Sequence, residues 1–369
     1  MGFAKVLILV LAASISCGAA LAQPVWRGSD DLPTSPRACP GKKEEPPPPR
    51  AYDGGLPAGA PDRVGKPLVV VDVPRITGVG YFDATARGMK EAAAELGTVE
   101  VKTEGPTQIS TSQQVGVIDD HVTAGVDGVL FAANDPIAVA PVLRKALSRG
   151  INVVGYDSDV SPEARQWFVN RAEPTGIAKA LIDGLAEQIG GSGGLAIITS
   201  TYEAPLQARW IAEMAAYAAK CYPGLVWLGT AEGREDPALS GREARILARR
   251  YGAALNGLIT LTNFATPGAA EALGQSGRCG EVAVIGLATP NVMKPHIASG
   301  CAQAVVLWNP VDLGYAAVYA LRAVADGELV PGATTLKAGR LGTLRVDGSE
   351  VLLGMPYVYT ADNIGAFNF

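Results

Sequence analysis

The 369-residue chain has few of the residues on which protein catalysis commonly depends. Histidine occurs only twice, as His121 and His296. His121 falls in an expected helix, where a surface or capping role is more usual than catalysis. The sequence contains no Walker loop, His-Glu-x-x-His motif or Gly-x-Gly-x-x-Gly fingerprint. We therefore expect a protein that is not an enzyme and that carries no cofactor.

Positive charge and long apolar runs are also scarce. The chain has 31 Lys and Arg against 36 Asp and Glu, a formal net charge of −5, and aromatic residues make up 6%. No basic run follows the N-terminus, which argues against a nucleic-acid partner. After residue 22 no apolar run is long and uninterrupted enough to span a bilayer. These absences indicate a soluble body.

The first 22 residues are typical of a signal peptide. Lys5 supplies the positive start, Val6 to Ile15 the apolar core, and Ala20-Leu21-Ala22 a cleavage site before Gln23. Removing Lys5 leaves 30 basic and 36 acidic residues, a net charge of −6. We expect an exported protein.

Cysteine is sparse, and one of the five cysteines is removed with the signal peptide. The remaining four are Cys39, Cys221, Cys279 and Cys301. In an oxidising compartment they permit two disulfides in three possible pairings. Cys279 and Cys301 each precede an expected strand at the same end of a sheet, so we expect these two to pair. The spacing fits no zinc pattern, and no metal site is expected.

Residues 23–66 lack apolar periodicity. They contain Pro-Gly and Gly-Gly breakers, the charged block Lys42-Lys43-Glu44-Glu45 and the run Pro46 to Pro49. Such a composition predicts a flexible Pro-rich leader that tethers the folded body.

From Leu68 onward, strands and helices alternate. Two successive series of about five strands, separated by the break at Gly190 to Gly194, predict two doubly wound α/β lobes and not one barrel. The expected strands are Leu68–Val73, Val99–Glu104, Gly128–Ala133, Asn152–Tyr156, Gln166–Val169, Leu195–Thr199, Leu225–Thr230, Gly257–Thr262, Glu281–Leu287 and Gln303–Trp308, followed by a C-terminal pair at Thr343–Val346 and Val351–Met355.

The first expected strand and the turn after it form the first wall of a candidate ligand cleft. Leu68–Val73 has five apolar residues in six positions, as a strand buried on both faces requires, and Pro74 ends it. The turn carries the cation Arg75 and the adjacent aromatics Tyr81 and Phe82. Ligands of open α/β sheets bind at the carboxyl ends of strands, where this turn lies.

Asp157 is the second candidate wall, at the end of strand Asn152–Tyr156. A carboxylate at a strand end can accept two sugar hydroxyls through charge-assisted hydrogen bonds. The alternative is a solvated turn carboxylate that caps the next segment. Asp157 is favoured over Asp159 because it lies nearer the strand. A secreted enzyme with Asp157 as acid or base is the other reading, but nothing in the sequence would push the acidities of the two carboxylates apart.

Polar and aromatic residues follow several other expected strands. A polar side chain that reads hydroxyls, next to a ring that stacks on an apolar face, suits a small hydroxyl-rich ligand. For Trp210 and Trp308 singly, a place in the domain core is an equal alternative. The candidates of this kind are Asn170, Gln207, Trp210, Asn263, Trp308 and Asn309, and Arg171 follows Asn170 directly.

From about Val70 to Phe369 the chain resembles the periplasmic substrate-binding proteins of ABC importers. It is similar to the ribose-binding (type I) branch, within it to the autoinducer-2-binding and rhamnose-binding subgroup. The matching stretches are Pro74 to Phe82, Gly105-Pro106-Thr107, Tyr156 to Asp159, Ala288 to Pro295 and Asp362-Asn363-Ile364.

The resemblance implies two Rossmann-like lobes joined by a three-stranded hinge, with residues 67–171 plus 309–331 in one lobe and 172–308 plus 332–369 in the other. It also implies a monomer in the periplasm that closes around one ligand and then docks on an inner-membrane ABC permease. A transcription regulator of the related repressor fold is excluded by the signal peptide and by the missing helix-turn-helix ahead of Leu68.

The resemblance also bears on the ligand. Autoinducer-2 binders carry a Lys where this chain has Arg75, and an Asp that matches Asp157. Their Asp-Gln pair falls on Leu206-Gln207, so one carboxylate is lost here. We expect a monosaccharide, rhamnose-like or another sugar. The alternatives are autoinducer-2 and a carboxylated heterocycle such as the quinone cofactor pyrroloquinoline quinone, which Arg75 could pair with beside Trp167, Trp210 and Trp308.

Overall fold

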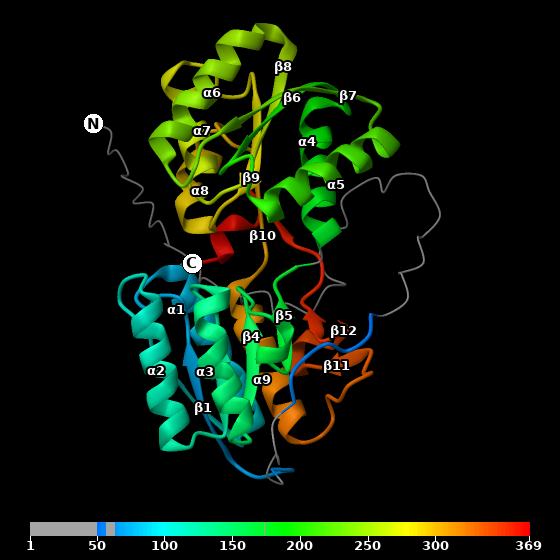
Figure 1. The fold of residues 1–369 in the computed structure, drawn as a ribbon. Helices are drawn as coiled ribbons and strands as arrows, with labels where there is room; N and C mark the ends of the chain where they lie inside the picture. The colour runs from blue at the N-terminus through cyan, green and yellow to red at the C-terminus, as the bar shows by residue number, and fades with distance from the viewer. Residues whose placement is uncertain (1–49, 57–62, 173) are drawn as a thin grey trace, which may run out of the picture.

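A computed structural model describes residues 50–56, 63–172 and 174–369. These residues form two α/β lobes, one above the other in Figure 1. The expected signal peptide, Cys39, and residues 23–49 and 57–62 of the expected leader lie outside the described residues. The fold class predicted from the sequence is confirmed.

The first lobe is built on an eight-stranded sheet of order β11-β12-β13-β5-β4-β3-β1-β2. Strands β1 to β5 pair in parallel, and their order 2-1-3-4-5 is that of a doubly wound sheet. The strands are β1 (Leu68–Val73), β2 (Val99–Thr103), β3 (Gly128–Phe131), β4 (Asn152–Tyr156), β5 (Trp167–Asn170), β11 (Thr335–Lys337), β12 (Thr343–Asp347) and β13 (Glu350–Leu352). The helices are α1 (Gly80–Leu96), α2 (Thr111–Ala124), α3 (Pro136–Ser148) and α9 (Pro310–Ala325).

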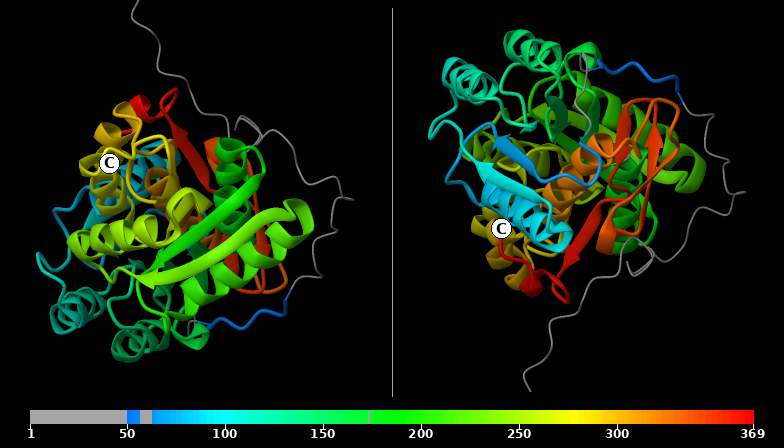
Figure 2. Two further views of the ribbon diagram at one scale, coloured as in Figure 1. Left: turned by 90° about the horizontal axis from the view of Figure 1, so that it is seen from above. Right: turned by 90° about the horizontal axis from the view of Figure 1, so that it is seen from below.

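The second lobe repeats this arrangement in a six-stranded sheet of order β14-β10-β9-β8-β6-β7. All neighbours are parallel except β14, which runs antiparallel to β10. Helices line each sheet in the views from above and below (Figure 2). The strands are β6 (Ser192–Thr199), β7 (Gly224–Glu232), β8 (Leu255–Thr260), β9 (Ala283–Leu287), β10 (Ala304–Leu307) and β14 (Tyr357–Thr360). The helices are α4 (Pro174–Ile189), α5 (Pro205–Cys221), α6 (Pro237–Tyr251), α7 (Ala265–Gln275) and α8 (Pro290–Ala298).

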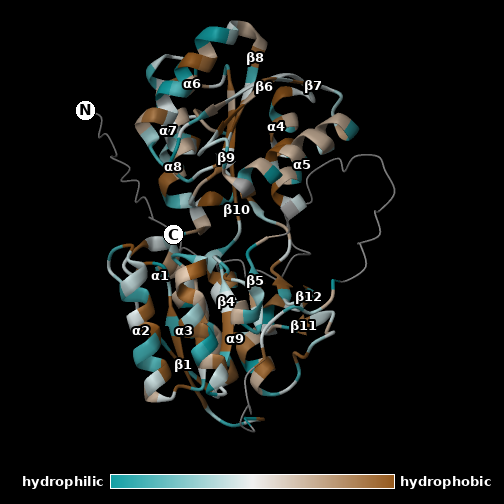
Figure 3. Cartoon of the chain, in the orientation of Figure 1, coloured by the Kyte–Doolittle hydropathy of each residue, from teal (hydrophilic) through white to brown (hydrophobic). Residues whose placement is uncertain are grey.

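The apolar run of β1 explains its central place. Leu68 and Val70 point into one core cluster, while Val71 and Val73 point into another beneath α2 and α3. Successive strand side chains face opposite sides, so only an almost continuous apolar run can serve a sheet covered on both faces. Figure 3 shows hydrophobic residues concentrated on the strands and hydrophilic ones on the outer helices.

The expected strands of the two doubly wound series all form, and their ends shift by at most three residues. The short strands β11 and β14 were not expected. β13 pairs in parallel with β5, Val351 opposite Val169, so β11–β13 extend the first sheet. The resemblance places residues 332–369 in the second lobe, but within that range only β14 joins the second sheet. A hairpin pattern predicts strands but does not say which sheet edge accepts them.

Residues 50–56 contact the first lobe, although the sequence predicts a flexible leader there. Arg50 forms ion pairs with Asp347 and Glu350. The ring of Tyr52 lies 5.0 Å from that of Trp167. The prediction of a flexible leader is therefore wrong for residues 50–56, because polar and aromatic side chains bind this segment to the sheet edge.

The predicted pairing of Cys279 with Cys301 is confirmed. The two Cα atoms lie 4.3 Å apart, across 22 residues of sequence, within reach of a disulfide. Cys39 lies outside the described residues, so the other expected pairing stays a prediction. No helix in the described ranges is long and apolar enough to cross a membrane.

The disulfide leads to a prediction about stability. Closing a loop of this length stabilises the folded state by about 3 kcal/mol, mainly through the unfolded chain. We expect the double variant Cys279→Ala/Cys301→Ala to lose about this much free energy of unfolding, measured by urea denaturation at neutral pH. Cys279 and Cys301 precede the amino ends of β9 and β10, whereas the candidate ligand cleft is expected at the carboxyl ends of the strands, so ligand affinity serves as the control. A loss below about 1 kcal/mol would contradict the prediction.

A second prediction concerns the buried carboxyl of Asp72 on β1. Its side chain is fully buried and accepts hydrogen bonds from Tyr156 Oη at 2.8 Å and Thr103 Oγ1 at 2.9 Å. Burial raises the pKa of Asp72 from 3.8 to about 7, against the lowering effect of these two hydrogen bonds. Between these values the folded protein holds a proton that the unfolded chain releases, so stability falls as pH rises.

We expect Asp72→Asn to remove this pH dependence. From pH 4 to pH 7 the free energy of unfolding of the wild type should fall, relative to the variant, by up to about 1.4 kcal/mol per pH unit. Urea unfolding of both proteins at several pH values measures the difference, and the titration of all shared groups cancels. Parallel stability curves would show that Asp72 is ionised in the folded state throughout.

Candidate functional site

Asp157 lies where the two lobes meet, directly after β4. Its carboxylate is 6% exposed, and its backbone has a φ of +60°, a left-handed conformation uncommon for residues other than glycine. Oδ1 accepts a hydrogen bond from Tyr81 Oη at 2.8 Å and pairs with Arg171 Nη1 at 2.9 Å. Oδ2 accepts from Ser158 Oγ at 3.1 Å. A left-handed backbone thus presents a buried carboxylate that three groups of the protein hold in place, and such backbone conformations are frequent at functional sites.

Tyr81 and Trp308 connect this carboxylate to the second lobe. Trp308, which follows β10, donates its Nε1–H to Tyr81 Oη at 2.6 Å. The two rings meet edge to face with centroids 6.4 Å apart, and the Arg171 guanidinium lies 4.8 Å from the Trp308 ring centroid. Burial, with the neighbouring charge of Asp157, holds the pKa of Tyr81 well above its usual value. The phenol is therefore neutral and donates its proton to Asp157.

These four side chains come from segments that are far apart in the sequence. Tyr81 belongs to the first turn of α1, Asp157 follows β4, Arg171 follows β5 and Trp308 follows β10. They meet because the carboxyl ends of these strands lie at the junction of the lobes. We call Tyr81, Asp157, Arg171 and Trp308 the junction cluster.

Arg75 lies at the switch point of the first sheet, where the turns after β1 and β3 diverge. Its Nε donates to Asn134 Oδ1 at 3.4 Å, and Asn134 Nδ2 donates to the Arg75 carbonyl at 2.9 Å. Asn134 is fixed in turn by Gln114, whose Oε1 accepts from its backbone N–H at 2.9 Å. The crevice at such a switch point is where doubly wound folds bind ligands.

The charge of Arg75 also reaches the second lobe. Burial raises the pKa of Glu235, which follows β7, while the positive charge of Arg75 opposes this shift. Glu235 lines a cavity of 610 Å³ at the carboxyl ends of β6 and β7. The cavity is lined by Ser200, Thr201, Tyr202, Glu203, Glu232, Arg234 and Glu235. Three carboxylates against one guanidinium make this wall acidic and rich in hydrogen-bond acceptors.

Gln207 and Asn263 hold the loops at the switch point of the second sheet. Gln207 Oε1 accepts hydrogen bonds from Thr199 Oγ1 and, at 2.7 Å, from the Ser200 N–H. Asn263 Oδ1 accepts from the Thr289 N–H at 2.8 Å and so joins the ends of β8 and β9. Asn263 therefore lies just after β8, whereas Gln207 lies in the first turn of α5 and reaches the end of β6 through its side chain.

Three other predicted site residues make their contacts outside the junction cluster, and a fourth, Phe82, packs against one of its members. Asn170 donates to Glu350 Oε2 at 2.8 Å, and Asn309 Oδ1 caps α9 by accepting from the Val311 N–H at 3.0 Å. Trp210 is 6% exposed within the core, as the alternative reading held. Phe82 is 8% exposed and lies behind Tyr81, with ring centroids 5.1 Å apart.

Sequence reasoning did not select Arg171, Asn134 or Glu235. Arg171 follows the selected residue Asn170. Because β5 ends one residue later than expected, at Asn170, it is Arg171 that contacts Asp157. Asn134 and Glu235 follow β3 and β7, and the same strand-end rule would have found them. In the described parts of the chain, no group of three or more His, Cys, Asp or Glu side chains could hold a metal ion.

Comparison with known proteins gives the family. Residues 69–329 match the family model described as a periplasmic binding protein domain. A solved structure of a sugar ABC transporter from Actinomyces odontolyticus is 33% identical, covers 84% of this chain and 100% of its own, and superposes with a TM-score of 0.77. An ABC transporter solute-binding protein from Clostridium phytofermentas with bound L-rhamnose is 26% identical, with coverages of 81% and 97% and a TM-score of 0.65.

Two further comparisons give weaker evidence, because one has low sequence identity and the other covers a short stretch. LsrB from Clostridium saccharobutylicum in complex with AI-2 is 23% identical, with coverages of 82% and 100% and a TM-score of 0.67, a likeness of fold alone. The D-ribose/D-allose-binding protein of Pseudomonas aeruginosa is 36% identical over 59 residues. That alignment spans 16% of this chain and 18% of the curated relative's length.

The extent of the family match, together with the two doubly wound lobes, confirms the resemblance inferred from the sequence. The chain belongs to the periplasmic binding protein family, among the solute-binding proteins of sugar ABC transporters.

Proposed function

We propose that the protein is a periplasmic receptor that closes around a monosaccharide and delivers it to an ABC permease. The observation that carries this proposal is the junction cluster. In it, Tyr81 and Arg171 of the first lobe hold the buried carboxylate of Asp157, and Trp308, which follows β10 of the second sheet, donates to the Tyr81 phenol. A carboxylate is a strong acceptor for paired sugar hydroxyls, and the Tyr81 phenol beside it is already oriented by its bonds to Asp157 and Trp308.

Closure follows from contacts to both lobes. The ligand binds one arrangement of the lobes more tightly than the other, and that difference in affinity sets how far it shifts the population. In the first lobe, Asp157 and Arg75 would contact the ligand. In the second lobe, the acidic wall that contains Glu235 would do so. The hydroxyls of a sugar can donate to acceptors on both walls at once.

The charges and the buried rings of the site favour a neutral sugar over a carboxylated ligand. A carboxylated heterocycle could pair with Arg75, but the carboxylates of Glu203, Glu232 and Glu235 would repel it. Trp167 and Trp210 are 1% and 6% exposed and offer such a ligand no stacking face. Autoinducer-2 remains the second candidate, although Leu206 stands where its binders carry a carboxylate. L-Rhamnose, the sugar bound by the Clostridium phytofermentas relative, is the first probe.

The contacts of Asp157 and Asp159 weigh against the enzyme reading. Arg171 binds Asp157, whereas Arg165 binds Asp159 at 2.8 Å. A catalytic acid or base must be free to exchange a proton with the substrate. Here each carboxylate has its own arginine.

We expect Asp157→Asn to weaken binding of L-rhamnose at least tenfold. The amide keeps the shape but loses the negative charge, and a hydrogen bond to a charged group contributes about 1.5–3 kcal/mol. Isothermal titration calorimetry measures the dissociation constant, and circular dichroism checks that the fold is intact. An affinity equal to that of the wild type would place the sugar elsewhere.

We expect Arg75→Ala to weaken binding as well, because the switch point loses its cation. The matched control is Arg87→Ala, which removes an arginine on the exposed side of α1 whose ion pair is with Glu91 of the same helix. The rise in Tm on adding sugar compares the affinities of the two variants, because it grows with the ratio of ligand concentration to Kd. Equal stabilisation of the Arg75 and Arg87 variants would contradict this role, and recovery of a chemically altered sugar would contradict a receptor.

A further inference from the structure

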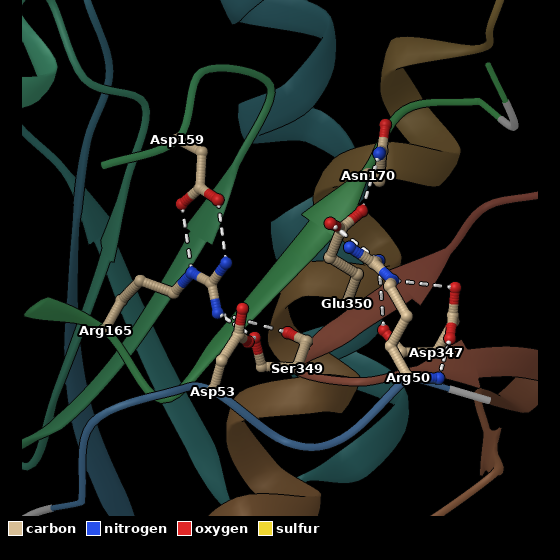
Figure 4. A network of polar contacts seen from close by, with 8 residues as sticks. All are labelled: Arg50, Asp53, Asp159, Arg165, Asn170, Asp347, Ser349 and Glu350. Carbon is tan, nitrogen blue, oxygen red and sulfur yellow. Dashed lines mark hydrogen bonds and ion pairs between the residues drawn. The ribbon is translucent and has the colours of Figure 1, made fainter. Parts of the chain in front are cut away.

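Residues 50–55 bind a part of the first lobe that is remote from them in sequence (Figure 4). The Arg50 backbone N–H donates to Asp347 Oδ1 at 2.7 Å and its Nε to Oδ2 at 3.0 Å, while Nη2 pairs with Glu350 Oε1 at 2.8 Å. The hydrogen bond with Glu350 is the main cause that raises the pKa of Arg50. Hydrogen bonds from Arg50 outweigh burial and lower the pKa of Asp347. One arginine thus ties the segment to β12 and β13.

The backbone of this segment fits its site closely. Gly55 N–H donates to the carbonyl oxygens of Pro162 at 3.1 Å and Arg165 at 2.8 Å. A Cβ on Gly54 would lie 2.3 Å from the Gln166 carbonyl oxygen, and one on Gly55 would lie 2.3 Å from that of Glu163. Such approaches exclude any side chain. Two successive glycines therefore allow a contact that other residues would prevent.

A chain of polar contacts leads from the segment to the Asp157 turn. Ser349 Oγ donates to Asp53 Oδ1 and accepts from Arg165 Nη1. Arg165 is 1% exposed, and its Nε and Nη2 donate to the two oxygens of Asp159 at 3.0 and 2.8 Å. Asp159 in turn accepts from the Val160 N–H at 2.8 Å. Because Asp159 is two residues beyond Asp157, this chain fixes the turn that presents the ligand carboxylate.

A second chain leads to the strands that continue into the other lobe. Glu350, held by Arg50, accepts from Asn170 Nδ2 at 2.8 Å. Asn170 is the last residue of β5, and its carbonyl accepts from the Leu353 N–H at 3.0 Å just beyond β13. After these points the chain leaves the first sheet toward α4 and toward β14. The segment therefore braces the ends of two connections between the lobes.

We propose that residues 50–55 are a clip that positions the Asp157 turn and the ends of β5 and β13. Arg50 and Asp53 act through Glu350 and Ser349, so they are positioning residues that do not touch the ligand. The effect of the clip on sugar affinity rests on the proposed function. Its positioning of the Asp157 turn does not depend on that function. Asn170, which the sequence predicts to bind the ligand, would instead connect the clip to the end of β5 through Glu350.

The first test uses the mature protein without ligand. Gly54→Ala forces the segment away from Gln166, while the matched control Gly116→Ala on α2 adds a Cβ that meets no atom within 4 Å. Amide hydrogen exchange followed by mass spectrometry should show residues 157–170 exchanging about tenfold faster in the first variant only. Exchange in α6 of the second lobe should not change. Unchanged exchange at residues 157–170, or an equal increase in both lobes, would overturn the proposal.

The second test separates positioning from simple loss of structure. Asp53→Ala removes the acceptor for Ser349, whereas Asp53→Asn keeps an oxygen at that position. We expect the Kd for L-rhamnose to rise at least threefold in the alanine variant and to return within twofold of the wild type in the asparagine variant. Equal affinities in all three proteins would overturn the effect on binding. If the wild-type protein does not bind L-rhamnose, the proposed sugar is wrong. The hydrogen-exchange experiment would still show whether the clip positions residues 157–170.

Discussion

The burial of one carboxylate at the junction of two lobes is the constraint on which the site depends. Asp157 is held by Tyr81 and Arg171 of its own lobe, and Trp308 of the second sheet bonds to the same phenol. A charge withdrawn from water is tolerated only when such partners surround it. The relative placement of β4, β5 and β10 therefore has to be accurate, and the φ of +60° at Asp157 is part of that placement.

The topology supplies this accuracy. Both lobes have the order 2-1-3-4-5, so each has a switch point where two turns diverge, and the connections between the lobes bring the strand ends together. Arg75 and Asn134 occupy the first switch point, Gln207 and Asn263 the second. The first lobe thus carries the cation Arg75 and the buried carboxylate of Asp157 near its strand ends, while three carboxylates line the carboxyl ends of β6 and β7 in the second lobe.

The first lobe is also supported by chain segments distant in sequence. β11–β13 come after α9 and extend its sheet, and residues 50–55 bind that extension through Arg50 and Asp53. Polar contacts continue from there to Asp159 and to Asn170. The Asp157 turn and the connections between the lobes thus share one framework of polar contacts.

The sequence by itself determined the elements of this protein. Alternating strands and helices, the apolar run of β1, the break at Gly190 to Gly194 and the pairing of Cys279 with Cys301 follow from local pattern, because burial on both faces and the phase of each series are written in neighbouring residues. The sequence also places Arg75 just after β1 and Asp157 just after β4, where the structure has them, whereas Tyr81, expected in the turn, belongs to the first turn of α1 because that helix begins at Gly80. Local pattern is sufficient for these features because each depends on a short stretch of chain.

Only the tertiary structure decided which of these residues meet. It put Arg171 and not Asn170 on Asp157, buried Trp210 in a core, joined β11–β13 to the first sheet, and bound residues 50–56 to its edge. Each outcome depends on the direction of a side chain at a strand end or on competition between sheet edges. Arg171 and Asp157 are 14 positions apart, whereas Asn170 and Glu350 are 180 apart and Arg50 and Asp347 are 297 apart. In each case the contact depends on how the elements pack in space, which no local pattern records.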